Sequence, residues 1–170
     1  APDTKALGRV FESLGFSAVA RHRSKKVTLY RQGDINFIVN AEPDSFAQSF
    51  ARVHGPSACA MAFRVRDAGR AFERAIALGA KPVQGKVGPM ELNIPAIMGI
   101  GGSLIYLVDR YGKAGGIYDI DFRPIPGAAS RSTPNSKGPG LKGPGPKGVG
   151  LAYIDHLTHN VHRGRMEEWS

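Results

Sequence analysis

Residues 58–79 read ACAMAFRVRDAGRAFERAIALG, and this stretch decides the fold. Its first part, 58–66, is an apolar run with the length of a strand. Asp67 then offers an N-cap to a helix that Leu78-Gly79 ends. The apolar positions of that helix share one face: Ala68, Phe72, Ala75 and Ile76. A strand followed directly by an amphipathic helix predicts the opening of a βαβββ unit, and candidate strands follow over 81–87, 91–97 and 103–109.

The same order of elements occurs nearer the N-terminus. Residues 3–14 have the apolar spacing of one helix face, with Asp3 as a candidate N-cap, and this helix also ends in Leu-Gly. Three short strands are predicted after it, over 17–23, 27–31 and 34–40, and then a connecting helix over 42–54. The sequence therefore predicts an α+β fold of two tandem βαβββ modules over 1–123, the first of which lacks its opening strand.

The composition changes after these modules. Residues 124–150 hold six of the 12 prolines, seven of the 22 glycines and four basic residues, but no acidic residue. This composition predicts a linker over 124–148. Residues 149–161 are again typical of a strand, and 165–170 of the start of a helix. We therefore expect 149–170 to be the truncated start of a C-terminal domain, and the chain to be a fragment.

The overall composition is that of an ordinary globular protein, with 42% hydrophobic and 22% charged residues among 170. No apolar run approaches the ~20 residues of a membrane-spanning helix, and the N-terminus lacks the apolar stretch of a signal peptide. We expect no membrane association and a cytoplasmic location. The single cysteine, Cys59, lies in an apolar run and is interpreted as a buried, inert thiol.

A net charge of +9 raises the question of nucleic acid binding. The basic groups are spread along the chain, because residues 1–122 hold 16 basic and 11 acidic residues and 123–170 hold 7 and 3. The densest cluster comprises Arg21, Arg23, Lys25 and Lys26. A solvated surface is the favoured interpretation of this cluster, with weak phosphate binding as the alternative. We therefore expect no nucleic acid partner, and such binding would show a steep dependence on salt.

Three of the five histidines lie close together, at His156, His159 and His162. Side chains alternate along a strand, so His156 and His159 would point to opposite faces and could not bind one ion. On a helix the same two residues would be neighbours, but the β-branched and apolar flanks favour a strand. A metal site here needs further ligands from elsewhere, and surface or interface positions are the alternative. His22 and His54 are interpreted as surface or interface residues.

Two other groups resemble binding motifs only weakly. Asp119 and Asp121 stand two apart on a predicted strand and could bind a cation, but a structural role is favoured because no other ligand lies nearby in sequence. The run 99–102, GIGG, has neither the spacing of a phosphate loop nor a helix after it, and a hairpin turn is the better interpretation. No Ser/His/Asp order or nucleophile elbow is present.

Several longer segments are similar to those of bacterial 4-hydroxyphenylpyruvate dioxygenases, in order and from about residue 5 to 169. They are RHRSKKVTLYRQGDIN at 21–36, HGPS at 54–57, GPMELNIPAI at 88–97, YDIDF at 118–122 and IDHLTHNV at 154–161. The resemblance covers the N-terminal part of that enzyme, up to the first strand of its catalytic half. It implies the vicinal oxygen chelate (glyoxalase/dioxygenase) fold, in which βαβββ modules pair into half-barrels.

The resemblance also implies a function. Members of the family use Fe(II), held by two His and one Glu, to convert 4-hydroxyphenylpyruvate and O₂ to homogentisate and CO₂ in tyrosine and phenylalanine catabolism. Of these ligands only His156 has a counterpart here, because the second His and the Glu would lie beyond residue 170. Asp155 and Asn160 are candidates to orient His156. The two N-terminal modules are expected to be metal-free and structural, since strand 58–63 has no His and strand 103–108 no Glu.

Two hypotheses follow from the sequence. In the first, the chain is an N-terminal fragment of an Fe(II) dioxygenase, inactive by itself and part of a homo-oligomer. In the second, it is a stand-alone vicinal oxygen chelate module used for binding or oligomerisation. Iron-dependent O₂ consumption with 4-hydroxyphenylpyruvate separates the two.

Overall fold

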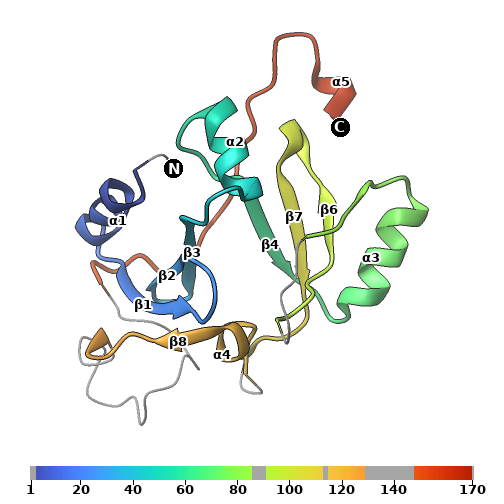
Figure 1. Cartoon of the computed structure of the whole chain (residues 1–170). Coiled ribbons are helices and arrows are strands. Elements are labelled where there is room, and N and C mark those ends of the chain that lie inside the picture. The colour runs from blue at the N-terminus through green and yellow to red at the C-terminus, as the bar shows by residue number, and fades with distance from the viewer. Residues whose placement is uncertain (1–2, 86–90, 113–114, 129–147, 170) are drawn as a thin grey trace.

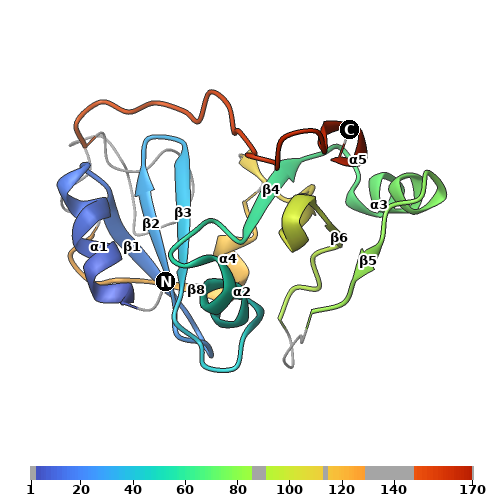
Figure 2. The same ribbon diagram turned by 90° about the horizontal axis from the view of Figure 1, so that it is seen from above.

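The computed structural model describes residues 3–85, 91–112, 115–128 and 148–169. Its elements are, in chain order, α1 (Thr4–Ser13), β1 (Ser17–His22), β2 (Val27–Gln32), β3 (Ile35–Asn40), α2 (Phe46–His54), β4 (Ala60–Arg64), α3 (Ala68–Ala77), β5 (Pro82–Val83), β6 (Ala96–Met98), the 3₁₀ turn η1 (Ile100–Gly102), β7 (Leu104–Val108), α4 (Tyr118–Asp121), β8 (Phe122–Pro124) and α5 (Met166–Trp169). The strands form two four-stranded sheets, ordered β3-β2-β1-β8 and β4-β7-β6-β5. Helices α1 and α3 lie at opposite ends of the molecule with both sheets between them (Figures 1 and 2).

The first module forms where the apolar spacing predicted it. The carboxylate of Asp3 accepts a hydrogen bond from the backbone N–H of Ala6, which satisfies one of the free donors at the start of α1. Helix α1 packs on its sheet through Phe11, whose ring stacks on Phe37 with centroids 4.8 Å apart and meets Phe16 edge to face. The three strands pair antiparallel in sequence order, and Leu29 is one of the fully buried side chains of the sheet.

The second module contains the same elements plus an opening strand. Strand β4 runs parallel to β7, which pairs antiparallel with β6, and β6 pairs antiparallel with β5. Asp67 caps α3 by accepting from the backbone N–H of Arg70 at 2.9 Å, as predicted. The run 99–102 is the connection between β6 and β7, so the hairpin interpretation is confirmed. The two strands predicted over 81–87 and 91–97 are shorter, since β5 ends at Val83 and β6 starts only at Ala96.

The sheet orders confirm the expected α+β fold of tandem modules and show how the first one differs. In the second module the opening strand β4 lies beside the last strand β7. Within the described ranges no strand lies beside β3, the corresponding strand of the first module. The first sheet gains its fourth strand at the other edge, where β8 pairs antiparallel with β1. The absence of an opening strand from the first module stays a prediction.

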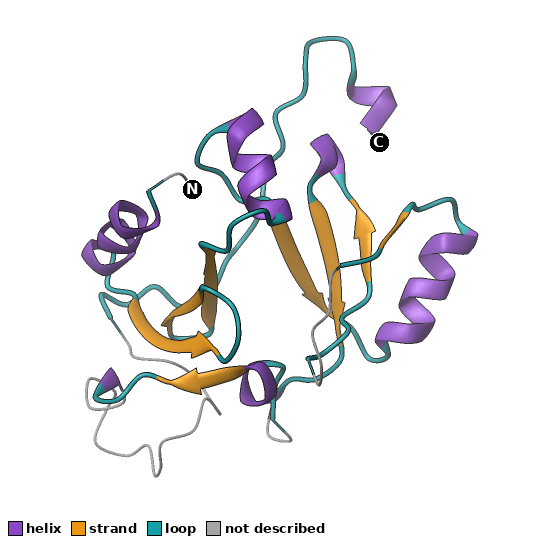
Figure 3. Ribbon diagram, viewed as in Figure 1, coloured by secondary structure: helices purple, strands orange, loops and turns teal. Residues whose placement is uncertain are grey.

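Two predicted strands are wrong. Residues 118–122 were expected to be a strand, but Tyr118–Asp121 is a single helical turn and the strand begins at Phe122. The cause is local, because the carboxylate of Asp119 accepts from the backbone N–H of Gly116 and closes the turn. Residues 149–161 were also expected to be a strand. Figure 3 shows this stretch as loop, and it pairs with no strand in the described part of the chain.

Residues 148–169, called the C-terminal stretch below, are largely exposed. This stretch starts beside the first module and runs toward the second, where α5 ends the described chain (Figures 1 and 2). Its apolar side chains face solvent, with Val149, Tyr153 and Leu157 all more than half exposed. The short helix α5 forms within the predicted range 165–170. Most of the predicted linker, residues 129–147, lies outside the described residues.

No helix in the described ranges is long and apolar enough to cross a membrane.

Candidate functional site

His156, the predicted metal ligand, lies in the exposed stretch before α5. Its Nδ1 is 2.7 Å from Oδ2 of Asp155, and both side chains are about three quarters exposed. A carboxylate on one ring nitrogen orients the imidazole and leaves Nε2 as the nitrogen that can bind a metal. Asp155 therefore contacts His156, and its role in orienting a metal ligand stays a prediction. No contact of Asn160 with His156 is found in the described part of the chain.

One imidazole does not make a metal site. Among the residues that the structure describes, no group of three His, Cys, Asp or Glu side chains comes together. His159 and His162 are exposed and do not join His156. The donor set present therefore does not by itself fit the two His and one Glu of a facial iron site. These residues can supply at most one of its ligands.

The alternative cation site at Asp119 and Asp121 is not formed either. The carboxylate of Asp121 is buried, accepts from the backbone N–H of Leu92 at 3.3 Å and lies 3.6 Å from the guanidinium of Arg23. The carboxylate of Asp119 caps the turn described above. The carboxylate oxygens of both residues therefore interact with groups of the protein itself. These contacts support the structural interpretation.

His22 and His54 also have structural contacts. The Nδ1 atom of His22 accepts from the backbone N–H groups of Ser24 and Lys25 and holds the turn between β1 and β2. Burial lowers the pKa of His22, and the nearby carboxylates of Glu91 and Asp121 oppose that shift. The ring of His54 stacks on Phe50 within α2, with centroids 4.2 Å apart. In the part of the chain that the structure describes, neither histidine belongs to a group of three side chains that could hold a metal ion.

The basic cluster of 21–26 is partly neutralised by the second module. The ammonium of Lys25 lies 2.6 Å from the buried carboxylate of Glu91, and Arg23 pairs with Asp121. These contacts tie the β1–β2 turn to segments that follow it by more than 60 residues. The favoured interpretation of a solvated surface therefore agrees with the exposed Arg21 and Lys26, but it is wrong for Arg23 and Lys25, which are half-buried and pair with acidic side chains.

Cys59 is half-buried, and burial raises the pKa of its thiol. A raised pKa keeps the thiol protonated and poorly nucleophilic, which agrees with the inert role expected for it.

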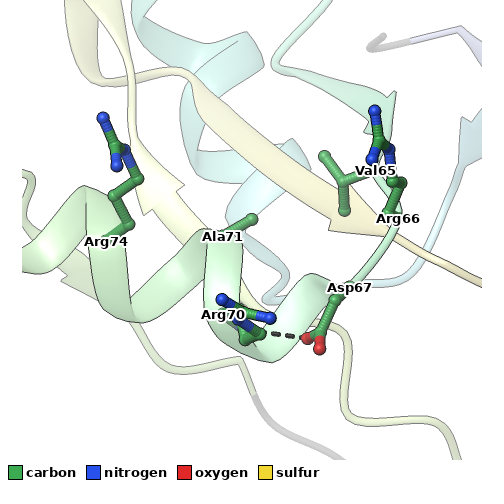
Figure 4. A pocket seen from close by; sticks show the side chains of 6 residues that line it. All are labelled: Val65, Arg66, Asp67, Arg70, Ala71 and Arg74. Atoms are coloured by element: carbon green, nitrogen blue, oxygen red, sulfur yellow. Dashed lines mark hydrogen bonds between the residues drawn. The ribbon is translucent and has the colours of Figure 1, made fainter.

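The hollow in Figure 4 is not a metal site. It lies at the start of α3 and is lined by Val65, Arg66, Asp67, Arg70, Ala71 and Arg74. Its one acid, Asp67, caps the helix, and its other charged groups are guanidiniums that cannot bind a cation.

Sequence reasoning missed one residue that touches the stretch carrying His156. The side chain of Gln32, at the end of β2, is fully buried and hydrogen-bonds to residues 149–151. No sequence pattern indicates this contact, because the two partners are 117 residues apart. Through these hydrogen bonds, the start of the C-terminal stretch is attached to the first module.

A sequence model described as "hydroxyphenylpyruvate dioxygenase, HPPD, N-terminal" matches residues 1–123. The chain belongs to the 4-hydroxyphenylpyruvate dioxygenase family. The match covers both modules and ends where the linker was predicted to begin. The family expected from the segments of the sequence is therefore confirmed, and with it the vicinal oxygen chelate type of fold.

Individual relatives extend the similarity past residue 123. The 4-hydroxyphenylpyruvate dioxygenase of Pseudomonas sp. (strain P.J. 874) is 52% identical over 169 residues, which is 99% of this chain and 43% of the relative. Hemolysin VllY of Vibrio vulnificus (strain CMCP6) is 56% identical over 164 residues, which is 96% of this chain and 42% of that protein. The chain thus spans less than half the length of the curated relatives that it matches.

A solved structure shows the same fold. It is a xylose isomerase-like TIM barrel/4-hydroxyphenylpyruvate dioxygenase fusion protein, which matches with a TM-score of 0.64 and 46% identity. The match covers 72% of this chain and 20% of the fusion protein. Both modules of the present chain therefore have a solved counterpart inside a larger protein.

Proposed function

We propose that this chain is the N-terminal part of an Fe(II) dioxygenase that converts 4-hydroxyphenylpyruvate and O₂ to homogentisate and CO₂. The observation that carries the proposal is the 52% identity over 169 residues to a protein of that name, which extends through the stretch that contains His156. In this proposal the protein acts in tyrosine and phenylalanine catabolism.

His156 is proposed as one iron ligand, with a second His and a Glu supplied by residues outside 1–170. Three points support this assignment. The Nδ1 of His156 is held by the Asp155 carboxylate and leaves Nε2 for a metal, the side chain is about three quarters exposed, and the described residues hold no competing ligand group. Bound Fe(II) would supply the chemistry of O₂, and the part of this chain would be to place one imidazole.

Residues 1–123 are proposed to have no part in the chemistry. Three of their candidate ligands, His22, Asp119 and Asp121, already accept hydrogen bonds from backbone N–H groups of the protein, which supports this proposal. Their proposed role is to build the scaffold from which the stretch with His156 extends. Homo-oligomer formation and the absence of a nucleic acid partner remain predictions, to be checked by the molecular mass in solution and by the salt dependence of any binding.

The first experiment is to read the coding region past the codon for Ser170 and to weigh the natural protein. Further βαβββ modules with a second His and a Glu would support the dioxygenase. A natural protein that ends at Ser170 would contradict it and favour the alternative of a non-catalytic vicinal oxygen chelate module for binding or oligomerisation.

The second experiment measures O₂ uptake by the intact protein with Fe(II) and 4-hydroxyphenylpyruvate. We expect uptake by the wild type and a loss of at least a hundredfold in the variant His156→Ala. The matched control is His159→Ala, which removes an exposed histidine three residues away and should keep most of the activity. Equal losses in both variants, or no uptake by the wild type, would contradict the proposal.

A further inference from the structure

We propose that Gln32 and three glycines form an anchor that fixes the C-terminal stretch on the first module and so positions His156. The inference rests on the proposed function only where it concerns His156, since the anchor itself is a feature of residues 15–33 and 148–151. Gln32 is the last residue of β2, and its side chain is fully buried.

The amide of Gln32 is used at both ends. Its Oε1 accepts from three successive backbone N–H groups, those of Val149 at 2.8 Å, Gly150 at 3.1 Å and Leu151 at 3.2 Å. Its Nε2 donates to the carbonyl oxygen of Leu14 at 2.9 Å, just past the end of α1. If this buried amide lost its partners, several polar groups would be left without a hydrogen bond at once. We therefore expect the four hydrogen bonds of the amide to form and break together.

Glycines allow the backbones to approach this closely. A Cβ atom on Gly15, whose φ is +83°, would lie 2.7 Å from the backbone nitrogen of Val149. A Cβ atom on Gly148 would collide with the carbonyl oxygen of Gly15 and the amide of Gln32. A Cβ atom on Gly33, whose φ is +54°, would lie 3.2 Å from the carbonyl oxygen of Leu151. Three glycines from distant parts of the chain thus make room for one contact.

The second module shows that this crowding is not a general property of the helix end. Gly79 follows Leu78 after α3 as Gly15 follows Leu14 after α1, and its φ is +98°. A Cβ atom on Gly79 would meet nothing within 4 Å. The backbone at both positions disfavours any other residue, but among the described residues a second segment contacts Gly15 and none contacts the Cβ position of Gly79. Docking of the C-terminal stretch is therefore specific to the first module.

The anchor limits where His156 can go. His156 lies five positions after Leu151, and a fully extended chain spans roughly 17 Å between the Cα atoms of two residues at that spacing. With residues 149–151 held on β2, the imidazole stays within that reach of a rigid sheet. Gln32 therefore acts as a positioning residue, which lowers the conformational entropy that ordering His156 would otherwise cost.

The test compares Gly15→Ala with its matched control Gly79→Ala in the intact protein. Amide hydrogen exchange is measured at residues 149–151, and thermal unfolding is measured alongside. Both variants strain a left-handed backbone, so we expect similar losses of global stability. Exchange at 149–151 should rise at least tenfold in Gly15→Ala and stay at the wild-type rate in Gly79→Ala. Equal exchange in the two variants, or unprotected amides in the wild type, would overturn the anchor.

The variant Gln32→Leu tests the amide directly. It keeps a buried side chain of similar size but removes both the acceptor and the donor, so exchange at 149–151 should also rise at least tenfold. For positioning, kcat with 4-hydroxyphenylpyruvate should fall at least fivefold while KM stays within twofold, and Gly79→Ala should leave kcat unchanged. An unchanged kcat alongside faster exchange would overturn the positioning role. If the wild type shows protected amides but no activity, the proposed function fails and the anchor stands.

Discussion

The two modules start from the same sequence signature, an Asp-capped helix that ends in Leu-Gly, but they are used differently. In the first, the end of α1 and the end of β2 are covered by residues 148–151, and Gln32 is fully buried between them. In the second, the end of α3 is open, and Leu78 is 77% exposed. The difference shows that a repeated unit can keep its fold while only one copy provides a docking surface. The following predictions test that difference.

The largest expected effect is in the core of the first module. Leu29→Ala removes a side chain with no exposed surface and should lower the free energy of unfolding by about 2–5 kcal/mol. Leu78→Ala, at the open end of the second module, should change it by less than about 0.5 kcal/mol. Urea unfolding of both variants measures the contrast. Similar losses would mean that the end of α3 is covered in solution.

A smaller effect is expected at the joint between the modules. Glu91→Gln removes the charge that Lys25 meets at 2.6 Å, and the Glu91 side chain is only 6% exposed. We expect a loss of about 1.5–3 kcal/mol, the range for buried hydrogen bonds to charged groups. Combining Glu91→Gln with Lys25→Met in a double-mutant cycle gives the part due to the pair. Strict additivity of the two changes would show that the pair does not join the modules.

The next effect concerns the cap of α3. Asp67→Ala removes the acceptor of the Arg70 backbone N–H and should cost about 1 kcal/mol. Asp67→Asn should keep most of the stability, because its side-chain oxygen can accept the same hydrogen bond. Thermal unfolding of the two variants compares them. If Asn were as harmful as Ala, the charge of Asp67 among the neighbouring arginines would matter more than the cap.

The smallest effect is a dependence of stability on pH from His22. Burial lowers the pKa of this histidine in the folded protein, so the unfolded chain binds a proton more readily. Stability from His22 is therefore present above its ordinary pKa of about 6.5 and is lost as the pH falls through the lower folded value. Unfolding midpoints between pH 7 and 5 should fall less in His22→Asn than in the wild type. Identical pH profiles would contradict the shift.

Elements with a full amphipathic pattern were predictable from the sequence. Helix α1 lies within the predicted 3–14 and α3 within 67–79, because each has an Asp cap, one apolar face and a Leu-Gly end. Elements whose state depends on a neighbour were not. Residues 149–161 have the alternation of a strand, but a strand needs a partner for its backbone hydrogen bonds and none lies beside them in the described chain. Residues 118–121 form a helical turn in which the Asp119 carboxylate accepts from the backbone N–H of Gly116, a contact that the strand pattern does not reveal.

The residues of the candidate site also differ in whether the sequence could identify them. Residue type and similarity to a family singled out His156, and its contact with Asp155 follows from their adjacency in sequence. Gln32 could not be found in this way, since an amide in an otherwise ordinary strand has no chemistry that marks it. Its function arises from contacts with residues 117 to 119 positions away.

The sequence by itself determined the repeated modules, their helix ends and the family, because these depend on local periodicity, caps and matching segments. Only the tertiary structure decided which module holds the C-terminal stretch. The physical reason is that both Leu-Gly ends adopt the same left-handed backbone, whereas a second segment lies against Gly15 and none of the described residues lies within 4 Å of a Cβ on Gly79. A contact between distant segments is set by packing and by paired polar groups, which no local pattern specifies.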